Sequence, residues 1–210
     1  MSNFVYNKNM NVNLLTNTPN PEILIAKAAS TCYDSVPKER VKARKMIQAI
    51  IKSGHESCIE HATVSFEISG ISRVLTHELV RHRLFSFSQR SQRYVDEANP
   101  SYVIPEEIEN NPKAKEVFIE AMNNAWNSYN KLQALGFKNE MSRYVLPNAC
   151  TTKICVSGNF REWRNFLKLR LSKRAQHEIR DLANIILDKL IEIAPSCFED
   201  LKDEANIQNT

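Results

Sequence analysis

Glycine is scarce in this chain of 210 residues, which contains only Gly54, Gly70, Gly136 and Gly158. No two of them have the spacing of the G-x-G-x-x-G or G-x-x-x-x-G-K motifs, in which glycines let a backbone loop approach a phosphate. The sequence therefore excludes a Rossmann-type or P-loop site. Any dinucleotide would have to be held by side chains and helix ends.

Long apolar segments and a disulfide framework are lacking as well. No window approaches the roughly 20 apolar residues of a membrane span, and residues 1–8 lack the apolar core of a signal peptide. We therefore expect a cytoplasmic protein with no membrane partner. The cysteines are odd in number and scattered, which is typical of reduced packing residues: Cys32, Cys58, Cys150, Cys155 and Cys197.

Charge excess is small, since 28 basic and 24 acidic residues give a net charge of +4. This is too little to imply polyanion binding over the whole surface. The positive charge is concentrated, because six basic residues and one acid, Glu162, lie between Arg161 and Arg174. With 42% hydrophobic residues, the chain can bury one good core or two small ones at most, and we expect a single domain over residues 1–210.

The hydrophobic pattern predicts a mixed α/β (α+β) fold. Alternation predicts strands, the clearest over 62–69 and ended by Gly70, whereas helical spacing and end signals predict helices. Asn20 is expected to cap one helix, Gly54 and Gly136 to end two others, and Asn159 with Glu162 to form a capping box. The predicted strands are 11–15, 62–69, 102–105 and 150–157, and the predicted helices are 21–29, 37–53, 71–80, 112–135, 141–146 and those from 159 to 193.

The stretch from Arg81 to Tyr94 carries the strongest functional signal. It contains four arginines, one histidine and three serines between apolar and aromatic residues, and no acid. Guanidinium groups suit phosphate or carboxylate oxygens, and hydroxyls with the carboxamide of Gln89 can complete the contacts. The stretch predicts a nucleotide-like ligand, with an RNA-binding surface as the alternative.

Two other chemistries receive little support from the sequence. His55, Cys58 and His61 have the spacing H-x2-C-x2-H, but a fourth zinc ligand is missing, so we expect no metal. No cysteine lies in a motif that would activate it as a nucleophile, although Cys32 and Cys58 come nearest.

Three motifs in order resemble those of the flavin-dependent thymidylate synthases. They are Arg81-His82-Arg83 followed after seven residues by Ser91, Arg93 and Tyr94; the upstream segment 55–62; and the downstream segment 159–170. The resemblance implies a central twisted sheet flanked by helices, and reductive methylation of dUMP to dTMP. It also implies FAD as cofactor, NADPH and methylenetetrahydrofolate as co-substrates, and a homotetramer with active sites shared between subunits. A flavin reductase without methyl transfer is the alternative enzyme.

The resemblance also implies site residues, carried over position by position. Arg170, Ser91 and His55 are the expected catalytic residues, and Arg170 would face the uracil edge. The expected FAD contacts are Ser57, Arg81, His82, Arg83, Gln89, Asn159, Arg161 and Asn165. The expected dUMP contacts are Glu78, Arg81, Gln89, Ser91, Arg93, Arg143 and Arg170. The chain departs from the family pattern at Glu78 (usually Gln), Ser88 (Asn), Gln89 (Glu in some members) and Arg174 (His in some members).

The helix expected from Asn159 gives a geometric prediction. At 100° per residue, Arg161 and Arg170 point about 180° apart, and Asn165 and Arg170 about 140° apart. One continuous helix would then not aim both sets of side chains at one pocket, which is consistent with sites shared between subunits.

Overall fold

The structure is a computed structural model and describes residues 5–6, 10–31 and 40–202. Contacts along the chain group these residues into two compact units. Unit 1 draws on the segments 1–11, 68–78 and 88–154. Unit 2 draws on the segments 12–67, 79–87 and 155–210.

The main sheet has four strands in the order β2-β3-β6-β4. Strands β3 and β6 are antiparallel, because Phe160 N donates to Ala62 O and Arg73 N donates to Cys150 O. The prediction that Gly70 ends its strand is wrong: β3 continues through Gly70, whose φ of 71° is a backbone conformation that glycine adopts without steric cost. The strands are β2 (Asn11–Asn17), β3 (Thr63–Ser72), β6 (Thr151–Asn159) and β4 (Ser86–Gln89).

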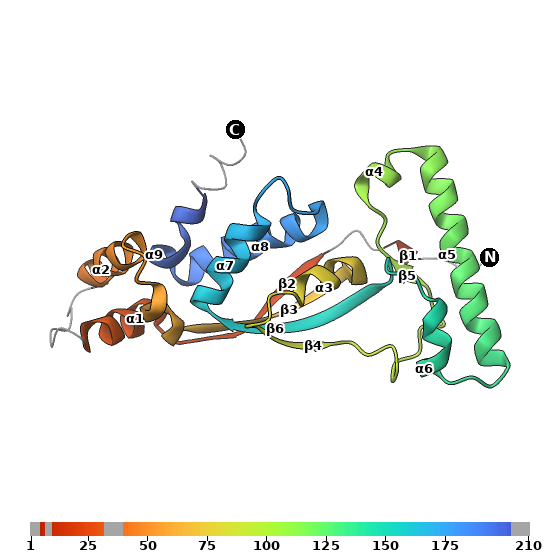
Figure 1. The fold of residues 1–210 in the computed structure, drawn as a ribbon, viewed down its shortest axis with the longest axis horizontal. Coiled ribbons are helices and arrows are strands. Elements are labelled where there is room, and N and C mark those ends of the chain that lie inside the picture. Colours follow the sequence, from red (N-terminus) through yellow and green to blue (C-terminus); the bar gives the residue numbers. More distant parts are fainter. Residues whose placement is uncertain (1–4, 7–9, 32–39, 203–210) are drawn as a thin grey trace. The chain divides into compact units, whose positions relative to one another are not determined.

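Unit 2 contains a cluster of helices. Helix α1 packs on α2 and η2, and α8 packs on α7 and α9 (Figure 1). The core beside α7 is aromatic: the Phe66 ring of β3 lies edge-on to Trp163 at 5.3 Å, and Phe166 is fully buried next to Trp163. The elements are α1 (Pro21–Ser30), α2 (Arg40–Lys52), η2 (Glu56–His61), α7 (Phe160–Arg170), α8 (His177–Ile193) and α9 (Pro195–Phe198).

Helix ends were mostly predicted correctly. Pro21 opens α1 as expected, but Asn20 has φ 47° and its side chain makes no capping hydrogen bond, so the predicted side-chain cap is wrong. Its backbone carbonyl accepts from Ile23 N and Leu24 N instead. Gly54 and Gly136, with φ of 78° and 88°, follow α2 and α5 as predicted. Residues 37–39 of the expected second helix lie outside the described residues.

Unit 1 is built around the long helix α5 (Pro112–Ala134). Helices α4 and α6 lie beside α5 (Figure 1), and strands β1 and β5 pair in parallel. The core of this unit consists of Tyr102, Ile104, Met122, Trp126 and Cys150. The remaining elements are β1 (Val5–Tyr6), α3 (Arg73–Leu79), β5 (Ser101–Tyr102), α4 (Glu106–Glu109), α6 (Asn139–Ser142) and η3 (Arg143–Val145).

The four-stranded sheet, with its antiparallel pair β3 and β6, and the helices together confirm the predicted mixed α+β class. Among the described residues, no helix has both the length and the apolar composition that a membrane crossing needs.

Candidate active site

Helix α7 begins with the predicted capping box. The Asn159 side chain accepts from Glu162 N at 3.0 Å, and Glu162 Oε2 accepts from Asn159 N at 2.9 Å. Both ends of this exchange satisfy N–H groups that the first turn of a helix leaves free. The helix start is therefore fixed by local chemistry, and the directions of Asn165 and Arg170 follow from it.

The Arg-His-Arg segment leaves α3 in a tight turn and is held by Phe85. His82 N donates to Leu79 O, Phe85 N donates to His82 O, and the Phe85 ring lies 4.4 Å from that of Trp163. A Cβ atom on Gly158 would overlap the Phe85 ring, so a residue without a side chain is required there. Gly158 thus lets Phe85 dock the loop against the start of α7.

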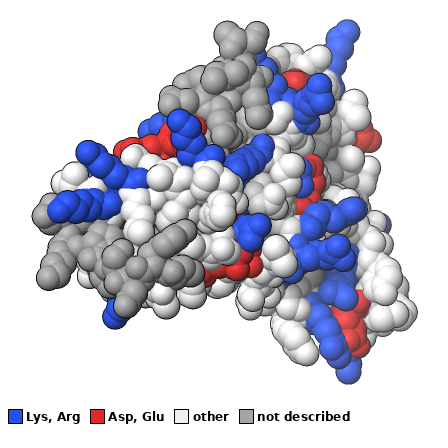
Figure 2. Space-filling view, turned by 60° about the vertical axis from the view of Figure 1, so that its left-hand side comes forward, with Lys and Arg blue, Asp and Glu red and all other residues white. Residues whose placement is uncertain are grey.

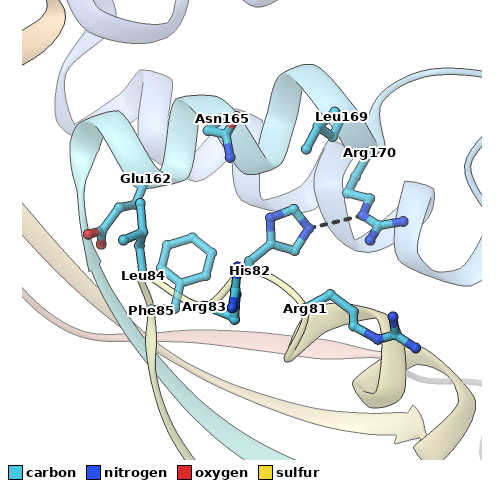
Figure 3. Close-up of a pocket in the computed structure, with 9 residues that line it drawn as sticks. All are labelled: Arg81, His82, Arg83, Leu84, Phe85, Glu162, Asn165, Leu169 and Arg170. Carbon is cyan, nitrogen blue, oxygen red and sulfur yellow. Dashed lines mark hydrogen bonds between the residues drawn. The ribbon is translucent and has the colours of Figure 1, made fainter.

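A cavity of about 470 Å³ lies between this loop and α7. Figure 3 shows the His82 ring between Phe85 and Arg170, with Asn165 and Leu169 on α7 above it. The cavity combines basic groups with apolar groups. Leu84 and Leu169, which are 75% and 56% exposed, form its apolar edge. Its lining is Arg81, His82, Arg83, Leu84, Phe85, Glu162, Asn165, Leu169 and Arg170.

His82 is neutral in this cavity. Burial, followed by the positive charge of Arg170, lowers the pKa of His82 from 6.5 to about 4. Arg170 Nε donates to His82 Nε2 at 3.0 Å, which requires the lone pair of Nε2, so Nδ1 carries the ring proton. His82 therefore holds the Arg170 guanidinium while keeping one donor of its own.

Arg81 and Arg83 are exposed, and neither guanidinium bonds to another group within residues 5–6, 10–31 and 40–202. The acid in the lining, Glu162, is already engaged by Asn159. On the face drawn in Figure 2, Lys and Arg side chains lie in separate groups with acids beside some of them. Arg81 and Arg83 thus offer two cations that no described acid neutralises, which favours an anionic ligand.

The remaining expected flavin contacts of α7 lie in a neighbouring pocket of unit 2. Arg161 and Asn159 line this pocket, and Arg161 pairs with Glu60 at 2.6 Å. Asn165 lines both pockets. The prediction that Asn165 and Arg170 face different pockets of one chain is therefore wrong, because the long Arg170 side chain reaches back to the cavity. Arg161 does face away from Arg170, as predicted.

His55 and Ser57 lie at the start of η2 and are exposed, outside the lining of both pockets. Cys58 is half-buried and His61 is exposed. In the part of the chain that the structure describes, no group of three or more His, Cys, Asp or Glu side chains is arranged to hold a metal ion.

Five expected ligand contacts belong to unit 1. Gln89 is committed to hydrogen bonds with the hydroxyls of Thr76 and Thr152, and Arg93 Nε pairs with Glu140 at 2.9 Å. Ser91 Oγ accepts from Arg93 N at 3.2 Å. The half-buried residues of this set are Glu78, Gln89, Ser91 and Arg143.

The family follows from the sequence comparisons. The model of the family described as thymidylate synthase complementing protein matches residues 13–196. The flavin-dependent thymidylate synthase of Clostridium tetani is 42% identical over 90% of this chain and 85% of its own length. This chain belongs to the flavin-dependent thymidylate synthase family. The enzyme of that name from Mycobacterium marinum is also 42% identical, over 89% of this chain and 82% of its own length.

A solved structure shows the same fold as this family member. The UMP/dUMP methylase PolB from Streptomyces cacaoi, bound with 5-Br dUMP, superimposes with a TM-score of 0.83. The alignment covers 93% of this chain and 95% of that one at 20% sequence identity. At this identity the likeness supports the fold and nothing finer.

Sequence reasoning missed several residues that build these sites in this family member. Phe85 and Gly158 position the loop of the cavity, and Leu84 and Leu169 form its apolar edge. Glu140 forms an ion pair with Arg93. Phe85 lies inside the recognised motif, but nothing in its spacing indicates contact with Gly158. Glu140 lies 47 positions from Arg93, so no local signal could have found the pair.

Proposed function

We propose that this chain is an enzyme that methylates dUMP reductively. Methylenetetrahydrofolate supplies the carbon and NADPH the reducing equivalents, and the products are dTMP, tetrahydrofolate and NADP⁺. The observation that carries the proposal is the cavity in which Arg81, His82, Arg83 and Arg170 meet, while Glu162, the acid of its lining, is engaged by Asn159. Family membership supports the same reaction.

The chemistry of the cavity fits FAD. Its phosphates suit the guanidinium groups of Arg81 and Arg83, and its flat ring suits the apolar edge formed by Leu84 and Leu169. Asn165 and the Nδ1–H group of His82 add neutral donors. When bound, the flavin supplies the redox chemistry, and the protein supplies binding, orientation and electrostatics. Ser57, Asn159, Arg161 and Gln89 remain predicted contacts of FAD.

Arg170 is the residue to which we assign the polarisation of the uracil ring. A fixed cation at a uracil carbonyl favours the anionic, more nucleophilic form of the base. Arg170 donates to neutral His82 through Nε, so this hydrogen bond does not use the two terminal nitrogens of the guanidinium group. His82 would thus preorganise the cation without adding a second charge.

The phosphate of dUMP is assigned to Ser91, Arg93 and Arg143, with Gln89 and Glu78 nearer the nucleoside. The ion pair between Arg93 and Glu140 is 56% and 40% exposed, so it is weak and can exchange for a phosphate. Because Glu78 replaces the usual Gln, an ionised carboxylate there would accept but not donate hydrogen bonds. His55 is proposed to act in the active-site region.

The reaction is proposed to need no cysteine nucleophile. Burial is the main cause that raises the pKa of Cys150 and of Cys197 to about 12, so both stay thiols. We further propose a homotetramer with active sites shared between subunits, a single domain over residues 1–210 and a cytoplasmic location.

Tritium release from C5-labelled dUMP tests the function. We expect release only when methylenetetrahydrofolate and NADPH are both present, together with a flavin absorption band in the purified protein. A flavin reductase would consume NADPH without tritium release. An RNA-binding protein would show neither flavin nor release, and either pattern would refute the proposal.

A further inference from the structure

An ion pair joins the two ends of the segment from Arg90 to Glu97, here called the 90–97 loop. Arg90 Nη1 lies 3.0 and 3.2 Å from the two carboxylate oxygens of Glu97, so the pair joins the two ends of the loop. Inside it, Val95 N donates to Ser91 O and Arg93 N donates to Ser91 Oγ. Ser91 and Arg93 therefore lie between two tied ends.

Helix α5 fixes the far end of the 90–97 loop. Trp126 Nε1 donates to Glu97 O at 2.7 Å, and the Tyr129 hydroxyl accepts from Glu97 N at 3.2 Å. That hydroxyl also donates to Asp96 Oδ1 at 3.1 Å. Trp126 and Tyr129 are 2% and 0% exposed, so their two bonds to the Glu97 backbone are shielded from water. Irregular backbone is thereby held by two rigid aromatic groups on a long helix.

The near end of the 90–97 loop is held by the sheet. Arg90 N donates to Lys153 O on β6 at 2.8 Å, and Arg73 Nη2 donates to Arg90 O at 3.1 Å. Both backbone groups of Arg90 are satisfied, as are the N–H and C=O of Glu97. The ends are therefore fixed, while the sequence between them carries Arg93 exposed to solvent.

Stability alone explains this arrangement poorly. Glu97 is only 5% exposed, and burial raises the pKa of its carboxyl while Arg90 acts in the opposite direction. This ion pair contributes little net stability compared with apolar residues, because the Glu97 carboxylate loses its hydration while the Arg90 side chain stays 32% exposed to water. What such a pair does supply is one defined geometry for the chain that it joins.

We propose that Glu97, Trp126 and Tyr129 are positioning residues for the nucleotide phosphate. They set the conformation of the 90–97 loop, and through it the places of Ser91 and Arg93. This inference rests on the proposed function, since it takes Ser91 and Arg93 as contacts of dUMP. Preorganisation of these two side chains would lower the entropic cost of binding the phosphate.

The test measures dUMP affinity by calorimetry on the FAD-loaded protein. Tyr129→Phe removes one hydroxyl with little change in volume, whereas Glu97→Met and Glu97→Gln share a similar size and differ in hydrogen bonding. We expect the dissociation constant of dUMP to rise about tenfold in Tyr129→Phe and Glu97→Met, and less in Glu97→Gln, with unchanged FAD content. The control Glu109→Gln disrupts the Lys115 pair elsewhere in unit 1 and should leave affinity unchanged.

Arg93→Ala separates this inference from the proposed function. If Arg93→Ala weakens dUMP binding but folded Tyr129→Phe and Glu97→Met bind like the parent, the loop needs no positioning and the inference is wrong. A lower unfolding midpoint with unchanged dUMP affinity would also overturn it, as a purely structural network. If Arg93→Ala itself binds dUMP normally, the proposed nucleotide contact and the inference both fail.

Discussion

Arg164 and Arg170 lie on the same helix and have opposite surroundings. Arg164 is 1% exposed and donates to Asp200 at 2.6 and 2.7 Å, to Glu56 at 3.4 Å and to the Cys197 carbonyl. Arg170 is half-buried at the edge of the cavity and donates to neutral His82. An arginine that is buried and bonded to two acids thus holds the fold together, whereas Arg170, which lies in the lining of a cavity, is placed where a ligand can reach it.

The largest expected effect is on the structural side of this comparison. Arg164→Met should lower the free energy of unfolding by about 3–5 kcal/mol, because Asp200 and the Cys197 carbonyl lose a buried partner. Urea denaturation measures this loss. Arg161→Met is the matched control on the same helix, since its pair with Glu60 is exposed and should not change stability measurably. Equal losses in both variants would contradict the distinction.

On the ligand side, Arg83→Ala and Asn165→Ala should weaken FAD binding. Each removes hydrogen bonds worth about 1–3 kcal/mol, or about tenfold to a hundredfold in affinity. Fluorescence titration of FAD into the apoprotein measures the change. Asn184→Ala, which removes the same amide from α8 outside the cavity, should bind FAD like the parent. Unchanged affinity in both cavity variants would remove these residues from the flavin site.

The protonation of His82, which binds Arg170, makes stability depend on pH. Its pKa is about 4 in the folded protein and about 6.5 when unfolded, so the unfolded chain binds more protons between these values. Its contribution to stability is thus complete above about pH 6.5 and is lost as the pH falls toward 4. The unfolding midpoint of the parent should fall more between pH 7 and pH 5 than that of His82→Phe. Parallel pH profiles would show that His82 titrates normally.

The smallest effects are expected from the cysteines. Single Cys→Ala changes should all leave turnover measurable, because buried Cys150 and Cys197 remain thiols and the reaction is assigned no thiolate. Modest stability losses should follow packing, with the largest at these two buried positions. Cys32 lies outside the described residues and is included in the series. A folded, FAD-loaded variant without any turnover would contradict the nucleophile-free mechanism.

Local chemistry explains which parts of the fold were predictable. The capping box of Asn159 and Glu162, and the glycine after α5, each depend on residues within a few positions, and all were confirmed. The role of Gly70 was predicted wrongly. The strand β3 continues through this residue despite its positive φ, because β3 is held by pairing with a strand that is distant in the sequence. Local signals therefore give helix ends more reliably than strand ends.

The site shows the same limit. The motifs identified Arg81, His82, Arg83 and Arg170, which the structure brings together. Composition could not tell Arg164 from Arg170, because the acids that saturate Arg164 come from positions 56 and 200. The helical angle of about 140° between Asn165 and Arg170 predicted wrongly that the two side chains do not share a pocket. This angle describes the Cα positions and ignores the length of the arginine side chain.

Arg170→Lys tests whether Arg170 polarises the uracil ring, because lysine keeps the charge and loses the planar fork. Variant and parent would be compared for bound FAD, for anaerobic bleaching of the flavin by NADPH, and for dTMP formation at saturating dUMP. We predict normal FAD content and bleaching. The activation free energy of dTMP formation should rise by about 2–4 kcal/mol, so that turnover falls. If dTMP formation persists near the parent rate while FAD content or bleaching collapses, Arg170 serves the flavin and the assignment is contradicted.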